Sequence, residues 1–290
     1  HEIQSGKELR KKYPEITLKI KQVFFHKIST YVLQQTSPLI IYAFTTLTLV
    51  AYYGNYMLVV TGVAMLLNAL FNSINAGVGN LIAEGDRKKI LGVFSELFAA
   101  RFFLSAGAAM LVFLLTPSFI GIWIGPGYLL PESTLILITV TMFINASRSS
   151  VDSFISGYGM FQDIWAPITE ALLNLGLSVL FGFFWGLDGI LLGVLTSLLL
   201  IVFIWKPYFL FRKGIKAPVA TYIRIYACNL AAFILAAGIE YIFLKFISIE
   251  SDAVGGFILY GLTVFISFAI FFYLTMSLCT KGMRSFTRRM

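Results

Sequence analysis

Eight long runs of apolar residues constrain the fold of this chain more than any other feature of its sequence. Crossing the hydrocarbon core of a bilayer takes about 20 helical residues, and backbone amides in lipid must find their hydrogen-bond partners within the helix. The runs therefore predict an all-α fold, a polytopic membrane helix bundle of about eight transmembrane helices. They lie near residues 24–47, 52–83, 92–115, 132–149, 164–186, 189–211, 219–247 and 254–279.

The composition agrees with a lipid environment, because 58% of the residues are hydrophobic and only 12% are charged. A soluble domain carries a charged fraction of about 25%. The net charge of +8 does not indicate nucleic acid, since the basic residues are confined to short connectors and form no continuous basic face. We therefore expect membrane lipids around the chain and no nucleic-acid partner.

The basic residues also predict how the chain is oriented. If the helices alternate in direction, all of the 22 Lys and Arg except Arg101, Arg148 and Lys245 fall at one side of the membrane. Basic connectors remain in the cytoplasm, so both ends of this segment are expected there. Residues 1–22 are polar and basic, lack the apolar core of a signal peptide, and read as a cytoplasmic linker. Because the chain starts with His1 and not Met, we expect a fragment.

The connectors on the opposite side are short, and none has room for a catalytic domain. The sequence shows no metal-ligand spacing, no glycine-rich phosphate loop and no nucleophile elbow. We therefore expect no enzyme and no cofactor. Charged or polar side chains within the spans are then the default functional candidates, because each is costly in lipid unless it is paired or faces water.

Arg101 is the first candidate, about nine residues into the third run, in SELFAARFFLSAG. One interpretation is a cation that faces a cavity and meets an anionic substrate. The alternative is that its long side chain reaches the cytoplasmic interface or neutralises Glu96. The sequence leaves both interpretations open.

Four further candidates lie toward the cytoplasmic ends of later spans. Arg148 and Asp152 are four residues apart on a continuing helix, so they can pair, either as a structural bridge or as a gating or substrate-contacting pair. Glu170 follows Pro167 at the start of the fifth run and has Asn174 one turn deeper on the same face. Its carboxylate could simply interact with the helix dipole.

A stripe of amides and several small residues complete the candidates. Asn68, Asn72 and Asn75 have spacings that place them on one face of the second run, where they either join helices or line a water-filled path. The glycine spacings 182–186 and 189–193 favour close packing of helices. Between them, WGLDG reads as a tight turn.

Two stretches carry a family resemblance. Residues 51–86, AYYGNYMLVVTGVAMLLNALFNSINAGVGNLIAEGD, resemble the corresponding part of bacterial polysaccharide flippases, the Wzx-type O-antigen and capsule exporters. Residues 147–194, SRSSVDSFISGYGMFQDIWAPITEALLNLGLSVLFGFFWGLDGILLGV, are similar to the downstream helices of that family. Several relatives carry an acidic residue in the first run where this sequence reads Thr36, Ser37, Pro38. The resemblance therefore does not assign the coupling ion, proton or sodium, to that span.

The resemblance implies the multidrug, oligosaccharidyl-lipid and polysaccharide exporter superfamily, with two six-helix lobes around a cavity and often two extra helices. On that mapping residues 1–22 are the linker, 23–216 the second lobe, and 217–290 two additional helices with a basic tail. The implied partners are an N-terminal lobe outside this chain, a polyprenyl-pyrophosphate-linked oligosaccharide and a polysaccharide polymerase.

The expected function is export of O-antigen or capsule repeat units across the bacterial inner membrane by alternating access. In this hypothesis Arg101 and Arg148 offer charge to the pyrophosphate, and the Asn stripe offers hydrogen bonds to the sugar. Two alternatives remain. An antiporter of cationic drugs from the same superfamily would favour acidic cavity residues, and a membrane subunit of the polysaccharide machinery would have no transport path of its own.

Overall fold

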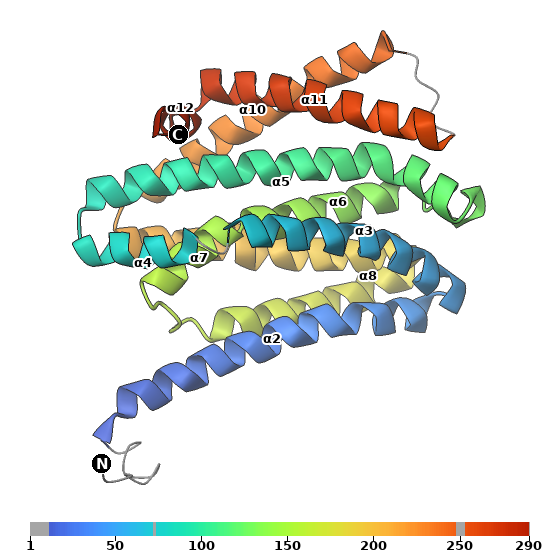
Figure 1. The fold of residues 1–290 in the computed structure, drawn as a ribbon. Helices are drawn as coiled ribbons and strands as arrows, with labels where there is room; N and C mark the ends of the chain where they lie inside the picture. Colours follow the sequence, from blue (N-terminus) through green and yellow to red (C-terminus); the bar gives the residue numbers. More distant parts are fainter. Residues whose placement is uncertain (1–11, 72–73, 248–252, 290) are drawn as a thin grey trace, which may run out of the picture.

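The computed structural model describes residues 12–71, 74–247 and 253–289, and within these ranges it contains helices and no strand (Figure 1). The predicted all-α helix bundle is therefore confirmed. Six helical segments in this part of the chain are long and apolar enough to cross a membrane, which indicates a multi-pass membrane protein. They are Leu47–Phe71, Arg87–Trp123, Glu132–Gly157, Trp165–Ile215, Val219–Lys245 and Val254–Cys279.

Two of the expected spans, 164–186 and 189–211, form one helical segment that turns back on itself. Helix α8 (Trp165–Leu198) reverses at Gly186, whose φ of +55° lies in the region that favours glycine. The second arm continues through η2 (Leu199–Trp205), α9 (Lys206–Phe209) and η3 (Leu210–Ile215). The segment of 51 residues therefore supplies two antiparallel arms.

Small residues hold the two arms of this hairpin close together. The Ser178 hydroxyl donates to the Ile190 carbonyl across the hairpin at 3.0 Å. A Cβ at Gly189 would meet the carbonyl of Phe181, and one at Gly193 would meet the backbone of Ser178. The close packing predicted from the glycine spacing is confirmed here, because backbone lies directly on backbone.

The remaining helices differ from the expected runs mainly at their ends. Helix α2 (Pro14–Phe44) begins inside the expected linker and is not among the six apolar segments, since its sequence carries the polar run QQTS. The expected run 52–83 corresponds to α3 (Leu47–Phe71) and α4 (Ile74–Glu84). Helix α5 (Arg87–Trp123) starts where the Asp86 carboxylate accepts the backbone N–H of Lys88 at 2.9 Å, a typical N-cap.

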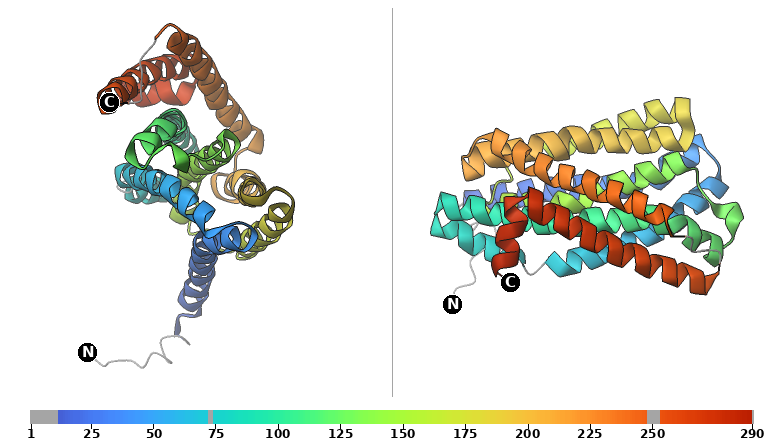
Figure 2. Two further views of the ribbon diagram at one scale, coloured as in Figure 1. Left: turned by 90° about the vertical axis from the view of Figure 1, so that its right-hand side faces the viewer. Right: turned by 90° about the horizontal axis from the view of Figure 1, so that it is seen from above.

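Helix α6 (Glu132–Ser147) runs into α7 (Ser149–Gly157), because Arg148 between them has helical φ and ψ of −57° and −27°. The connector expected at 150–163 is therefore shorter, and begins after Gly157. The chain ends in α10 (Val219–Lys245), α11 (Val254–Cys279) and α12 (Lys281–Arg289). Figure 2 shows α10 and α11 at one edge of the bundle and α2 at the opposite edge.

The bundle has one strongly basic end. The α4–α5 turn, the α7–α8 connector, the start of α10 and helix α12 all lie at the end where α2 begins (Figure 1). Contacts join these segments, because Gly157 lies against Ile82, Gly214 against Met160, and Gly282 against the backbone of Ser95. This end carries Arg87, Lys88, Lys89, Arg212, Lys213, Lys216, Lys281, Arg284, Arg288 and Arg289. Helix α10 ends with Lys245 at the other end.

The other end is held by polar contacts that tie connecting segments to helices. The Tyr56 hydroxyl accepts the backbone N–H of Leu130 at 3.0 Å. The Asp188 carboxylate, in the turn of the α8 hairpin, accepts hydrogen bonds from Ser133, at 2.6 Å, and from Thr134. These contacts fix the hairpin turn to the start of α6.

An aromatic seam packs the basic half of the bundle together. Its rings come from α5, α7, η3 and α10. The ring centroids of Phe94 and Phe154 are 5.1 Å apart, those of Phe94 and Phe211 5.2 Å, and those of Phe98 and Tyr222 5.8 Å. Aromatic pairs at such distances add stability beyond their buried area. The seam comprises Phe94, Phe98, Phe102, Phe154, Phe211, Tyr222 and Tyr226.

Candidate functional site

Four charged side chains form a cluster between α7, α8 and α9, within the bundle. The Asp152 carboxylate accepts from Arg148 Nε at 3.0 Å through one oxygen and from Lys206 Nζ at 3.0 Å through the other. Arg148 also lies 3.8 Å from the Glu170 carboxylate. Two cations and two carboxylates therefore neutralise one another, which offsets the water that these partly buried charges lose.

The cluster draws its members from residues that are far apart in sequence. Arg148 and Asp152 are one turn apart on the joined α6–α7 helix, so the predicted pair is confirmed. Glu170, on the first arm of α8, and Lys206, on its returning arm, are brought to this pair by the hairpin. Their side chains are only 5% and 12% exposed, so both charges depend on their partners in the cluster.

Arg101 is a fifth charged group and is only 6% exposed. Its guanidinium carbon lies 4.3 Å from the ring centroid of Phe71, a cation–π distance. No carboxylate of the described residues lies within ion-pair distance of it. Asp152 acts on it electrostatically from the neighbouring cluster. With Arg101 included, the site holds three cations and two carboxylates.

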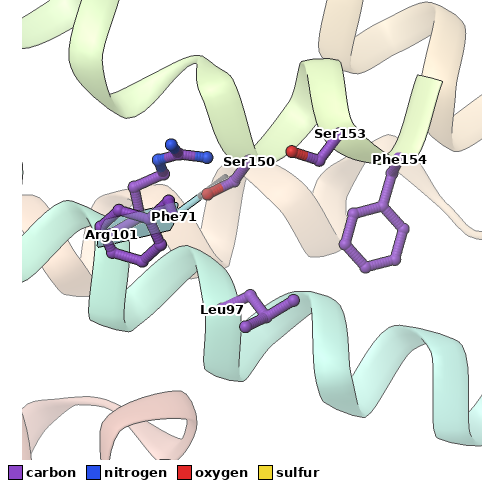
Figure 3. Close-up of a pocket in the computed structure, with 6 residues that line it drawn as sticks. All are labelled: Phe71, Leu97, Arg101, Ser150, Ser153 and Phe154. Carbon is purple, nitrogen blue, oxygen red and sulfur yellow. The ribbon is translucent and has the colours of Figure 1, made fainter. Parts of the chain in front are cut away.

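A small hollow adjoins Arg101 (Figure 3). Its guanidinium extends from α5 toward the Ser150 side of α7, and Phe71 lies beside it. The Ser150 hydroxyl is buried and has no hydrogen-bond partner among the described residues. The hollow offers about 10 Å³ to a water-sized sphere, which is room for about one water molecule. In this conformation it admits neither a phosphate group nor an oligosaccharide.

The alternative role for Arg101, neutralising Glu96, is wrong. Glu96 instead pairs with Arg289 of α12 at 3.3 Å, so its charge is matched at the basic end of the bundle. The Arg101 side chain is buried against Phe71, and the alternative that it reaches the cytoplasmic interface stays a prediction.

The two predicted amides whose side chains the structure describes, Asn68 and Asn174, are not brought together with the charges. Asn174 is buried but donates to Ser197 Oγ at 3.3 Å across the α8 hairpin, a contact that joins the two arms. Asn68 is exposed on α3. Asn72 and the side chain of Asn75 lie outside the described residues. The single-face Asn stripe therefore stays a prediction.

Sequence reasoning missed two members of the site. Lys206 is not among the predicted site residues, but it lies in a helix and its side chain is only 12% exposed. The signal was its position directly after the apolar run LLLIVFIW. Ser150 could not be predicted from the sequence, because no local feature distinguishes it from the neighbouring serines.

The part of the chain that the structure describes contains no group of three His, Cys, Asp or Glu side chains that could hold a metal ion. Comparison with known proteins gives no relative, since no family model, no curated protein and no solved structure matches the chain. The chemistry of the site must therefore be argued from its own geometry. That geometry is a neutralised charge cluster beside one cation without a carboxylate.

Proposed function

We propose that this chain is part of a flippase that exports polysaccharide repeat units, carried on polyprenyl pyrophosphate, across a bacterial inner membrane. One observation carries the proposal: Arg101 is a buried cation with no carboxylate partner among the described residues, and it adjoins a hollow with an unpaired serine hydroxyl. Such a site favours an anion, because a fixed cation replaces the hydration that a phosphate loses in lipid.

The charge balance assigns different roles to the two arginines. Arg148 is already engaged by Asp152 and Glu170, so it positions the cluster and has little charge left for a substrate. Arg101 is the better contact for a pyrophosphate. The sugar would lie outside the small hollow, between this bundle and a second bundle, since alternating access needs two bundles that move against each other. No covalent bond is made or broken in this function.

A cationic substrate fits this arrangement less well. An antiporter of cationic drugs needs a carboxylate free to bind them, but Asp152 and Glu170 both face cations of the chain. Drug susceptibility of a strain that lacks the gene separates the two functions. Hypersensitivity to cationic drugs with normal surface polysaccharide would contradict the proposal.

The proposal can be tested in a strain of the source organism that lacks the gene. Variants of the gene are introduced into this strain, and the surface polysaccharide that each restores is measured. Arg101→Ala should reduce surface polysaccharide about tenfold to a hundredfold, since a charged hydrogen bond contributes about 1.5–3 kcal/mol. Arg101→Lys keeps the charge and should retain part of the export. Surface polysaccharide is measured by gel electrophoresis of cell extracts, and protein in the membrane by immunoblot.

Arg212→Ala is the matched control, because it removes an exposed arginine from the basic end and should leave export unchanged. If Arg101→Ala protein accumulates normally and exports normally, Arg101 has no part in transport. If the full-length protein, reconstituted in vesicles, moves no labelled lipid-linked oligosaccharide, the chain belongs to a membrane subunit without a transport path.

A further inference from the structure

A second buried acid lies outside the charge cluster, between α10 and α11. Glu240 on α10 has an exposed fraction of 0%, and its Oε1 lies 2.7 Å from the hydroxyl oxygen of Ser267 on α11. These two helices form the pair at the edge of the bundle (Figure 2). None of the cluster residues takes part in this contact.

The contact lies at the depth of the membrane interior. Helix α11 has 26 residues, about 39 Å at 1.5 Å per residue, which exceeds the hydrocarbon thickness of about 30 Å. Ser267 is midway along this helix. The carboxyl group it contacts therefore lies between two apolar spans, where an ionised carboxylate is poorly tolerated.

Glu240 also lacks the partners that an ionised carboxylate needs. Its Oε2 is buried without a hydrogen-bond partner among the described residues, and no described cation is within ion-pair distance. Lys245, on the same helix, lies over the Tyr241 ring at 4.5 Å. The ionisable residue Tyr260, on α11, lies two turns before Ser267.

The Ser267 hydroxyl has more short contacts to oxygen atoms than hydrogens to donate. Its Oγ lies 2.7 Å from Glu240 Oε1 and 2.7 Å from the backbone carbonyl of Thr263. A serine hydroxyl has one hydrogen to donate, and a carbonyl oxygen can only accept. If Ser267 donates to Thr263, as serines in membrane helices commonly do, the second short contact requires a hydrogen on Glu240.

We propose that Glu240 is a proton-binding site between the two apolar spans α10 and α11, a neutral carboxylic acid whose O–H donates to Ser267. The site suits a proton and not a metal ion, because two carboxyl oxygens and one hydroxyl are too few ligands for a hard cation. This inference does not depend on the proposed transport of polysaccharide, since it concerns a different pair of helices.

The test is infrared spectroscopy of the full chain in lipid nanodiscs. The difference between wild type and Glu240→Gln should contain one carbonyl band of a protonated carboxylic acid. The band should shift to lower frequency after equilibration in D2O, which shows that the proton exchanges. Glu132→Gln is the matched control, because it removes an exposed carboxyl group and should leave the band in place.

Ser267→Ala keeps the experiment decisive if Glu240→Gln does not fold. Without the serine oxygen the acid loses its acceptor, so the band should shift to higher frequency and persist. Folding of each variant is checked by circular dichroism. Three results would each overturn the proposal. They are a folded Glu240→Gln protein that keeps the band, a band whose frequency does not change in D2O, and a band whose frequency does not change in Ser267→Ala.

Discussion

Asp152 is the residue on which the charge cluster depends, because it accepts from two cations on two different helices. Arg148 reaches it from the adjacent turn, whereas Lys206 reaches it across the α8 hairpin. Removing one member of such a group leaves the other charges buried without compensation, and this loss exceeds the net gain from forming the group.

We expect Asp152→Asn to destabilise the protein by about 1–3 kcal/mol, because Lys206 and Arg148 lose a shared ionic acceptor. Lys206→Met should lower the free energy of unfolding by less, since Asp152 keeps its contact with Arg148. In the double variant, Lys206→Met should restore part of the stability that Asp152→Asn removes. The measurement is the free energy of unfolding in mixed detergent micelles.

The exposed pair of Glu84 and Lys89 provides the control for these variants. Glu84→Gln should change stability by no more than about 1 kcal/mol, because surface ion pairs contribute little. If Glu84→Gln and Asp152→Asn lower the free energy of unfolding equally, burial does not determine how much the cluster stabilises the protein.

At the scale of whole helices, the α8 hairpin makes the site possible, since its two arms present Glu170 and Lys206 to the same helix. The arms can lie this close only where side chains are absent. Gly189 and Gly193 face the backbone of the opposite arm, while Gly176 on the first arm has nothing within 4 Å of the position of a Cβ.

Gly193→Ala should therefore force the arms apart and cost about 1–3 kcal/mol or more, because the added methyl group would meet backbone that cannot rotate away. Gly176→Ala places the same methyl group in open space and should be neutral or slightly stabilising. Thermal unfolding and the yield of folded protein distinguish the two. A Gly193→Ala protein as stable as Gly176→Ala would mean that the arms are not in backbone contact.

Much at this scale could be predicted from the sequence. Apolar length predicts where helices lie, the WGLDG turn predicts the reversal at Gly186, and spacing of four predicts the Arg148–Asp152 pair. Lys206 and Glu240 could not be assigned in this way. Their partners, Asp152 and Ser267, lie on other helices, and a sequence of one chain does not reveal which distant helices come into contact.

For the molecule as a whole, the basic connectors gather at one end, and Lys245 lies near the other. If the rule for basic connectors holds, this end faces the cytoplasm. The polar contacts of Tyr56 and Asp188 would then lie on the outer side of the membrane.

The orientation can be measured by labelling single cysteines in intact cells, after Cys228 and Cys279 are replaced by alanine. A cysteine at Gly127, in η1 (Pro126–Tyr128), should react with a membrane-impermeant maleimide from outside. A cysteine at Lys88 or Lys213 should react only after the membrane is permeabilised. The reverse pattern would contradict the assigned orientation.

The aromatic seam has a mechanical consequence. Rings from α5, α7, η3 and α10 interlock edge to face, so sliding any one of these elements by a turn would break several ring contacts, each contributing about 0.5–1.5 kcal/mol. Ring contacts with α5 thereby couple the positions of α10 and α11, at the edge of the bundle, to that of α5. We therefore expect a tilt of α5 to move both helices with it.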